Sequence, residues 1–357
     1  MGDLQIKNRI CMAALTRERA DPKTLIPTDL MAEYYSQRTQ FGMILTDCAT
    51  VSKIGHCFER GPGIFTQEQA DGWKKIVDKV HQGDSLIFMQ IWHGGRASDP
   101  LINKSGITYG PSPIGIKLIN RRANNEYYKV PHEMTKQQIK EVIEEFKQGA
   151  IYCKQAGFDG IQLHGANGYL VDQFLRDSSN QRNDEYGGSV ENKCRFCLEI
   201  IDALIEVYGN SKRIGIKISP VSRFNDMYDN DPIKTFSYLI QELDKRNIGF
   251  IELREVEKVM VKSNYPNDGK EQIPDCAKQF RHLFKGIIID NEGFEYQSGL
   301  DKLKEGNCDM ISFGRLAISN PDLPFRFQKG LQVNNNYDQK TYYSEGEIGY
   351  IDYPFFE

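Results

Sequence analysis

The stretch Gly160-Ile161-Gln162-Leu163-His164-Gly165-Ala166-Asn167-Gly168-Tyr169 decides how this chain is interpreted. A short apolar run ends here in polar and aromatic side chains. We therefore expect a buried strand that lifts His164, Asn167 and Tyr169 onto one rim of a sheet. Neutral His and Asn side chains donate hydrogen bonds and can hold an oxygen that gains negative charge, while a nearby tyrosine can supply a proton. Taken alone, these residues are better explained as a strand end that caps the next helix; the rest of the chain reverses that preference.

Seven further runs rich in Val, Ile and Leu alternate with amphipathic helical stretches. Thr66 and Thr135 are each followed three residues later by Gln, as in a capping box, and Asp231 and Asn320 each precede a first-turn proline. Eight strand–helix units in 357 residues predict a (β/α)8 TIM barrel, one domain over residues 1–357. The expected strands are 9–15, 43–50, 85–92, 160–164, 213–219, 250–253, 286–290 and 309–313. The expected helices are 28–40, 67–81, 136–156, 190–208, 232–246, 274–284, 296–305 and 321–329.

Composition narrows the class of protein. Hydrophobic residues make up 39% of the chain, enough for a large core, and the formal net charge of −4 argues against nucleic acid or an anionic membrane as the main partner. No apolar run is long enough to span a membrane and the start does not read as a signal peptide, so we expect a cytoplasmic protein. Cys194 and Cys197 form a C-x-x-C inside a helical run without a second pair at zinc spacing, so we expect reduced thiols and no metal site.

A barrel places its active site at the carboxyl ends of its strands. The loops after the last two expected strands resemble the phosphate site that such barrels form, where glycine N–H groups and a helix N-terminus receive an anion. Arg315 would add a forked cationic partner to that anion. Polar, aromatic and glycine residues converge on this rim: Thr16, Gln90, Trp92, His164, Asn167, Tyr169, Lys217, Gly293, Gly314 and Arg315.

Three long stretches carry a family resemblance. The first runs from His164 to Asn192, and the second is Phe313-Gly-Arg-Leu-Ala-Ile-Ser-Asn-Pro-Asp-Leu323. The third lies near the carboxyl end, with Tyr337-Asp, Thr341-Tyr-Tyr343 and Gly349-Tyr-Ile-Asp-Tyr-Pro354. In this order they resemble the Old Yellow Enzyme family of FMN-dependent ene-reductases. The resemblance covers almost the whole chain and implies a barrel that binds FMN non-covalently.

The resemblance implies which residues contact the cofactor. Thr16 would bond the flavin near O4 and N5, as in the yeast- and plant-like branch, and Gln90 would bond the pyrimidine edge. Lys217, where most relatives have Arg, would place a positive charge beside N1 and O2 and favour the anionic reduced flavin. The remaining implied FMN contacts are Ala14, where relatives usually have Pro, and Gly293, Gly314 and Arg315 at the phosphate.

The resemblance also implies the chemistry at the substrate. His164 and Asn167 would bind the carbonyl oxygen, flavin N5 would deliver hydride to the β-carbon, and Tyr169 would protonate the α-carbon. The pocket over the flavin would be shaped by Trp92, Phe224 and Tyr343. As plain sequence features, Trp92 and Phe224 could equally be packing residues, and Lys217 could be a strand-end lysine in a salt bridge.

The implied activity is that of an NADPH dehydrogenase and ene-reductase. NAD(P)H would reduce FMN, and reduced FMN would reduce an α,β-unsaturated carbonyl compound or a nitroalkene in a ping-pong cycle, in a monomer or homodimer. The chain lacks a Rossmann fingerprint, which fits a reductant that visits the flavin as a substrate. Loops 99–131 and 255–273 are expected to select the alkene.

Other interpretations remain open. The chain could be a non-catalytic flavin- or ligand-binding relative, or a quinone or xenobiotic reductase. A larger flavin/iron–sulfur relative would need a cysteine cluster after the barrel, which this sequence does not contain. Glu292 lies in the expected phosphate loop, where its negative charge would be unhelpful near a phosphate unless its side chain points to solvent. Relatives carry further residues before Gly2, in a hairpin that closes the barrel floor, so this hairpin is expected to be shortened.

Overall fold

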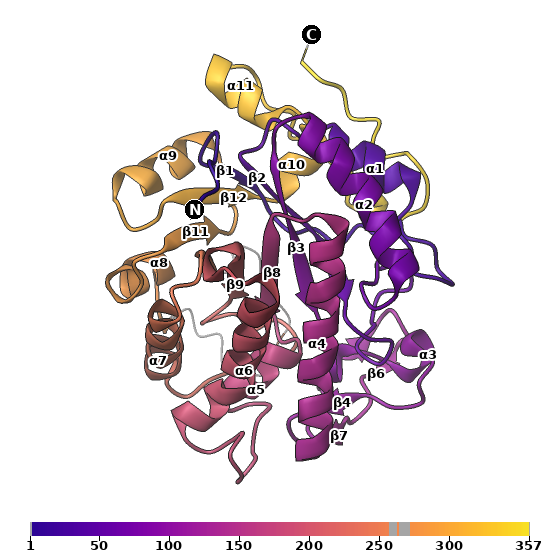
Figure 1. Cartoon of the computed structure of the whole chain (residues 1–357), viewed down its shortest axis with the longest axis vertical. Coiled ribbons are helices and arrows are strands. Elements are labelled where there is room, and N and C mark those ends of the chain that lie inside the picture. Colours follow the sequence, from indigo (N-terminus) through magenta and orange to yellow (C-terminus); the bar gives the residue numbers. More distant parts are fainter. Residues whose placement is uncertain (1, 257–262, 264–271, 357) are drawn as a thin grey trace.

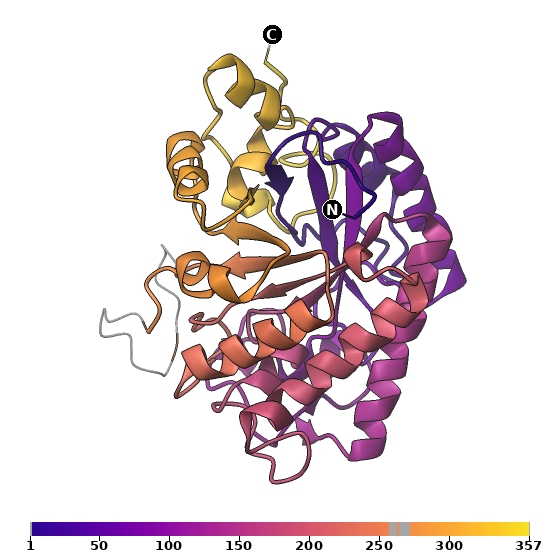
Figure 2. The same cartoon turned by 60° about the vertical axis from the view of Figure 1, so that its left-hand side comes forward.

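The fold is a closed barrel of parallel strands wrapped in helices (Figures 1 and 2). The computed structural model describes residues 2–256, 263 and 272–356. Within these ranges eight strands close in the order β1-β12-β11-β10-β9-β8-β3-β2. The predicted (β/α)8 TIM barrel is therefore confirmed. The barrel strands are β1 Ile10–Met12, β2 Met43–Thr50, β3 Leu86–Trp92, β8 Gly160–Gly165, β9 Ile214–Ile218, β10 Phe250–Arg254, β11 Ile287–Asn291 and β12 Met310–Phe313.

The outer helices begin where the sequence places most of their caps. Thr66 and Thr135 form the predicted capping boxes, and the Asp231 side chain accepts a hydrogen bond from the Lys234 backbone with Pro232 in the first turn. Helices α4 and α6 have the predicted bounds. The helices that follow barrel strands are α1 Asp29–Ser36, α2 Gln67–Gln82, α4 Lys136–Ala156, α6 Val190–Tyr208, α7 Pro232–Lys245, α8 Cys276–Phe280, α9 Tyr296–Lys304, α10 Arg315–Ser319 and α11 Leu323–Lys329.

The predicted cap at Asn320 is wrong. Helix α11 begins at Leu323, and Asn320 instead follows α10, a short helix that the sequence did not reveal. The Asn320 amide donates to the backbone oxygens of Leu316 at 2.9 Å and Asn334 at 2.8 Å. It therefore closes one helix and ties it to the carboxyl-terminal segment rather than opening the next. The expected helix 274–284 is also shorter, because α8 gives way to a 3-10 turn at Arg281–Leu283.

Smaller elements extend two loops at the carboxyl ends of barrel strands. The loop after β3 carries helix α3 and two short strand pairs, β4 with β7 and β5 with β6. The loop after β8 carries helix α5, which directly follows Tyr169. These elements lie over one rim of the barrel. Their bounds are α3 Pro100–Asn103, β4 Tyr109–Gly110, β5 Ile119–Asn120, β6 Glu126–Tyr127, β7 His132–Glu133 and α5 Leu170–Leu175.

The lower half of the barrel interior is apolar. Phe88 and Phe250 meet edge to face with centroids 5.5 Å apart, and Leu4 and Ile6 pack against the same cluster from the amino-terminal segment. This layer fills the floor of the barrel, so ligand chemistry is left to the opposite rim. The buried members of the cluster are Cys11, Met43, Leu45, Phe88, Phe250, Ile289 and Met310.

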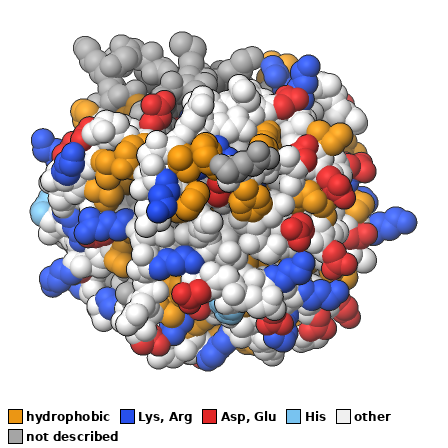
Figure 3. Space-filling model, turned by 90° about the horizontal axis from the view of Figure 1, so that it is seen from above, with side chains coloured by type: hydrophobic (Ala, Val, Ile, Leu, Met, Phe, Trp, Pro, Cys, Tyr) orange, Lys and Arg blue, Asp and Glu red, His pale blue; other side chains and the backbone are white. Residues whose placement is uncertain are grey.

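The outer surface carries mixed charge. On the face seen in Figure 3, basic and acidic side chains are interspersed around the perimeter with hydrophobic side chains between them. Among the helices that the structure describes, none has the length and apolar character to cross a membrane. All eight cysteines are unpaired and buried. No group of three or more metal-ligating side chains gathers within residues 2–256, 263 and 272–356.

Candidate active site

A layer of polar side chains lies directly above the apolar floor. Gln90 follows Phe88 by two residues and Glu252 follows Phe250 by two, so each points into the same barrel interior as the phenylalanine before it. Gln90 Nε2 donates to Gln162 Oε1 at 2.5 Å, and Gln162 Nε2 donates to Glu252 Oε2 at 2.8 Å. All three side chains are buried, and such groups persist in a core only when they are hydrogen-bonded.

Lys217 closes this layer on the side of β9. Its Nζ donates to Glu252 Oε1 at 3.0 Å and to Asn291 Oδ1 at 3.1 Å. Ser312 Oγ donates to the same Glu252 oxygen at 2.8 Å. Glu252 is fully buried, so its charge requires this cation. Lys217 is therefore a salt-bridged strand-end lysine, as the plain alternative holds, and it also lines the site above.

Two adjoining cavities open above the polar layer. One has a volume of about 490 Å³ and the other about 350 Å³, and both are lined by Ala14, Leu15, Lys217 and Arg315. The larger cavity brings together Gly293, Gly314 and Arg315, which were predicted at the phosphate, with Ala14 and Lys217, which were predicted as further FMN contacts. The smaller cavity brings together most of the remaining predicted residues: Thr16, Gln90, His164, Asn167, Tyr169, Phe224 and Tyr343.

The larger cavity is shaped by the loops after β11 and β12. Gly293 adopts a φ of 65°, and a Cβ on Gly314 would lie 3.3 Å from Leu15, so glycine permits the close backbone approach there. Arg315 is a half-exposed cation at this cavity. A cationic fork beside glycine backbone suits a phosphate, and Thr16, Gln90 and Lys217 offer hydrogen-bonding groups in the adjoining cavity. These residues fit a phosphate-bearing flavin such as FMN.

The Glu292 side chain does not point to solvent. Its Oε2 accepts a hydrogen bond from Arg254 Nε at 3.0 Å, and its Oε1 lies 3.8 Å from Arg315 Nη2. The side chain is only 16% exposed. The two arginines therefore hold the carboxylate inside the cavity, where it opposes an incoming anion.

His164 presents a neutral donor to the smaller cavity. Its Nδ1 accepts a hydrogen bond from the Ala166 backbone at 3.3 Å, so a neutral ring carries its proton on Nε2. Burial lowers the pKa of His164 to about 3, and the charges of Lys217 and Arg254 add to this effect. The imidazole is therefore uncharged at neutral pH and can only donate through Nε2.

Asn167 is fixed by three hydrogen bonds. Its backbone has a φ of 60°, in the left-handed region, and its N–H donates to Ser219 Oγ at 2.8 Å. Asn225 Nδ2 donates to its backbone oxygen at 2.9 Å. Its side-chain oxygen accepts from Arg254 Nη1 at 2.7 Å, which leaves the amide nitrogen as the group directed elsewhere. His164 and Asn167 can thus offer two donors to one oxygen.

Tyr169 lies beside His164 and Asn167 and keeps its phenol protonated. Its ring lies 4.5 Å from Trp92 and 5.1 Å from His164, edge to face in both cases. Burial raises the pKa of Tyr169 well above its usual value, so the hydroxyl keeps its proton at neutral pH. Trp92 is fully buried and also stacks on Phe58 at 5.2 Å. Within the described residues, Trp92 does not line the cavity itself. It packs behind Phe58 and Tyr169, whose rings do line the cavity.

Phe224 and Tyr343 stand at the mouth of the smaller cavity, 40% and 48% exposed. The segment that carries Tyr343 is anchored by Arg17, which donates to backbone oxygens of residues 341, 342 and 349. Arg122, from the loop after β3, lies 4.5 Å from the Tyr343 ring centroid. That loop was expected to select the alkene, and through Arg122 it contacts Tyr343, which lines the cavity. In the second expected loop, residues 257–262 and 264–271 lie outside the described residues.

Several residues of this site were not predicted. Gln162 and Glu252 could have been recognised as polar side chains inside otherwise apolar strands. Arg254 ends β10, and a cation at the carboxyl end of a barrel strand is the signal that could have identified it. Cys48, whose Sγ donates to Gln90 Oε1 at 2.7 Å, carried no signal of its own in the sequence.

Comparisons with known proteins identify the family of the chain. Residues 1–334 match the model of the NADH:flavin oxidoreductase / NADH oxidase family. The chain is 38% identical over 359 residues to 12-oxophytodienoate reductase 1 of Oryza sativa subsp. japonica, covering 100% of this chain and 92% of the relative. It is 38% identical over 362 residues to a probable flavin mononucleotide-dependent alkene reductase of Leishmania infantum, covering 99% and 95%.

A solved structure supports the same assignment. The old yellow enzyme homologue from Zymomonas mobilis superimposes with a TM-score of 0.90 at 33% identity, over 99% of this chain and 97% of that one. A family model over most of the chain and relatives of this identity and coverage are sufficient to assign a family. The chain belongs to the NADH:flavin oxidoreductase / NADH oxidase family, that of the FMN-dependent Old Yellow Enzymes.

Proposed function

We propose that this protein is an NADPH-dependent ene-reductase that reduces the C=C bond of an α,β-unsaturated carbonyl compound or a nitroalkene. One observation carries the proposal. His164 and Asn167 are held as two neutral donors at a single cavity, and the protonated phenol of Tyr169 lines the same cavity. This combination can bind a carbonyl oxygen and deliver a proton to the carbon framework of the same molecule.

The cofactor would be held by residues at both cavities. Arg315 and the backbone at Gly293 and Gly314 would receive the phosphate, and Thr16, Gln90 and Lys217 would meet the ring beside Ala14. Bound FMN, reduced by NADPH, would supply the hydride that the alkene β-carbon receives.

The residues of the chain supply the remaining steps. His164 Nε2–H and the Asn167 amide bind the substrate oxygen, and their hydrogen bonds strengthen as that oxygen becomes negative. Tyr169 gives its proton to the α-carbon, which completes addition of one hydride and one proton across the double bond. Water then restores the tyrosine proton. Because His164 stays neutral, the oxygen is stabilised by hydrogen bonds and takes no proton from the imidazole.

An anaerobic stopped-flow experiment tests the proposal. The protein loaded with FMN is reduced with NADPH, or with NADH for comparison, and is then mixed separately with cyclohexenone, a nitroalkene and a quinone. We expect the yellow absorbance to bleach with NADPH and to return with the enone and the nitroalkene. Protein that binds FMN but is reduced by neither nucleotide would be a non-catalytic relative. Return of colour with the quinone alone would identify a quinone reductase instead.

A further inference from the structure

We propose that Arg254 is a positioning residue that turns the amide of Asn167 toward the substrate oxygen, and that Glu292 holds Arg254 in that role. The inference rests on the proposed function of Asn167 and deepens it. Arg254 ends β10, and its side chain is 15% exposed. Its Nη1 donates to Asn167 Oδ1 at 2.7 Å and its Nε donates to Glu292 Oε2 at 3.0 Å.

The chemistry of the two groups fixes the direction of the amide. A guanidinium has only donors, so an asparagine that bonds to it must present its oxygen. The amide nitrogen of Asn167 then faces the other way, as the donor that a substrate oxygen needs. If the amide rotated by half a turn, its oxygen would face the substrate oxygen and repel the developing charge. Arg254 therefore selects the productive one of two orientations of similar shape.

The amide orientation is the main freedom left to Asn167. Its backbone N–H already donates to Ser219 Oγ at 2.8 Å, and its backbone oxygen already accepts from Asn225 Nδ2 at 2.9 Å. Its φ of 60° lies in the left-handed region, which asparagine adopts more readily than most residues with a side chain. The backbone is thus held independently of Arg254, and a change at Arg254 should alter the side-chain amide before it alters the loop.

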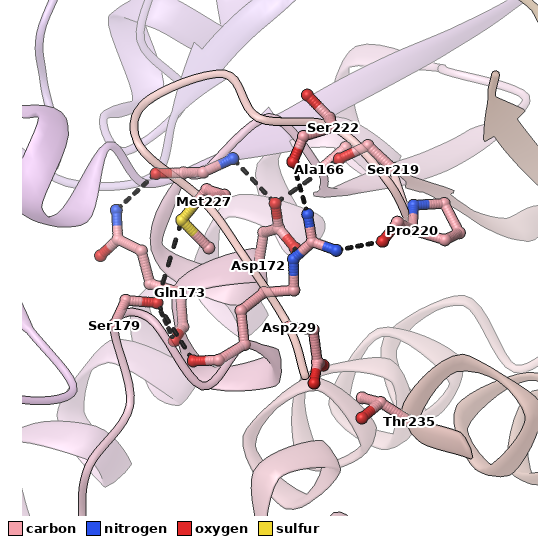
Figure 4. Close-up of polar contacts among 12 residues, drawn as sticks. Ala166, Asp172, Gln173, Ser179, Ser219, Pro220, Ser222, Met227, Asp229 and Thr235 are labelled. Atoms are coloured by element: carbon pink, nitrogen blue, oxygen red, sulfur yellow. Dashed lines mark hydrogen bonds and ion pairs between the residues drawn. The ribbon is translucent and has the colours of Figure 1, made fainter. Parts of the chain in front are cut away.

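The loop around this contact is held by further hydrogen bonds. Ser222 Oγ accepts from Arg254 Nη1 at 3.2 Å. Figure 4 shows Asp172, Ser219, Pro220 and Ser222 in a network of polar contacts, in which the Ser222 backbone oxygen accepts from Arg176 Nη2 at 2.7 Å. Arg176 also donates to the Pro220 oxygen and lies 3.5 Å from the fully buried Asp172. Asp172 Oδ2 in turn accepts from Ser219 Oγ at 3.5 Å. The serines that meet Asn167 and Arg254 therefore belong to one buried network.

Glu292 completes the arrangement from the opposite loop. It has a φ of 127°, a region that residues with side chains rarely adopt and that is costly to maintain. Its carboxylate engages Arg254 Nε, which leaves Nη1 aimed at Asn167. The strained backbone of Glu292 thus places its carboxylate beside Arg254 Nε, while Arg254 Nη1 contacts Asn167.

A double-mutant cycle on the FMN-loaded protein tests the positioning role. The four proteins are wild type, Asn167→Ala, Arg254→Met and the double variant, measured by kcat/KM for cyclohexenone and by Kd for phenol, a turnover-free probe of the same donors. We expect Arg254→Met alone to lower both affinity and kcat/KM by about tenfold, because a charge-assisted hydrogen bond is lost. In the Asn167→Ala background the same change should alter either value by less than about twofold.

Control variants separate positioning from structural damage. Arg254→Lys retains a donor and should recover most of the activity. Arg223→Met removes a neighbouring arginine that bonds to Gln272 and should leave both values near wild type. Glu292→Gln should lower both values less than Arg254→Met does and should have no further effect in the Arg254→Met background.

Two outcomes overturn the inference, and each is distinct from failure of the proposed function. Losses that multiply in the double variant would show that Arg254 acts independently of Asn167. An unchanged phenol Kd in Arg254→Met would show that the amide needs no positioning. Wild-type protein that reduces no alkene would refute the proposed function, while the phenol cycle would still decide whether Arg254 acts through Asn167.

Discussion

Lys217 Nζ lies 3.0 Å from Glu252 Oε1, and their Cα atoms are register partners on β9 and β10. The pair marks the boundary between the apolar floor and the cavities above. Because the buried carboxylate also accepts from Gln162 and Ser312, it organises the polar layer on which a cofactor ring would rest. The positive charge of Lys217 that the sequence predicts is therefore present, but the neighbouring carboxylate of Glu252 largely balances it.

Replacing Lys217 with Met should destabilise the fold strongly. The change leaves Glu252 as an unpaired buried charge, and breaking a buried pair in this way typically costs about 3–5 kcal/mol in the free energy of unfolding. Urea denaturation of the FMN-free protein measures the loss. Lys217→Arg keeps the charge and should lose much less, as should the double variant with Glu252→Gln. Equal stability of Lys217→Met and wild type would show that the ion pair is not needed.

Replacing both His164 and Asn167 with Ala should abolish phenol binding and slow the reduction of enones. Loss of one oxyanion donor typically costs about 10²–10³ in rate. Reduction of the flavin by NADPH should suffer less, because hydride arrival needs no oxyanion. Steady-state kinetics with cyclohexenone and a phenol titration followed by flavin absorbance measure these effects. Enone turnover that survives the double change would remove both residues from the mechanism.

His164 should make the fold more sensitive to acid. Its folded pKa of about 3 lies below the ordinary value of 6.5, so the unfolded chain binds an extra proton between these values. Stability should therefore fall as pH decreases below 6.5, by about 1.4 kcal/mol per pH unit for this one group. The test compares unfolding free energies of wild type and His164→Asn from pH 8 to pH 5. Parallel curves for the two proteins would contradict the buried neutral assignment.

Replacing Glu292 with Gly should tighten FMN binding. The change removes a carboxylate that faces Arg315 and opposes an incoming phosphate. Fluorescence titration of the FMN-free protein gives the Kd. Glu292→Gln removes the same charge, so it should tighten binding by a similar factor. Weaker FMN binding in both variants would mean that Glu292 supports the cofactor rather than opposing it.

Local sequence patterns were sufficient to predict the fold and part of the candidate site. The bounds of β2, α4 and α6 agree with the sequence because apolar spacing, caps and terminal glycines point to the same ends. His164, Asn167 and Tyr169 line one cavity because a barrel gathers all its strand ends at one rim. These features depend on neighbouring residues or on a general property of the architecture.

Contacts between distant loops could not be predicted in the same way. Arg254 meets Asn167 across 87 positions in the chain, and nothing local to either residue indicates the other. The direction of the Glu292 side chain depends on a backbone angle that the sequence does not encode locally. Asn320 precedes a proline, as the N-cap residue of a helix often does, but in the structure it lies at the carboxyl end of the short helix α10. In each case the decisive partner comes from a different part of the chain.

The most direct measurement is the pair of half-reactions of Tyr169→Phe by anaerobic stopped flow. The variant keeps the ring that packs on Trp92 and loses only the hydroxyl group that carries the proton. Reduction by NADPH should stay near wild type, and reoxidation by cyclohexenone should slow by about 10²–10⁴ because its α-carbon lacks an acid. Reoxidation by a nitroalkene or a quinone should persist, since those products can be protonated by water. If all acceptors and NADPH slowed equally, Tyr169 would be structural and the proposed proton donor would be wrong.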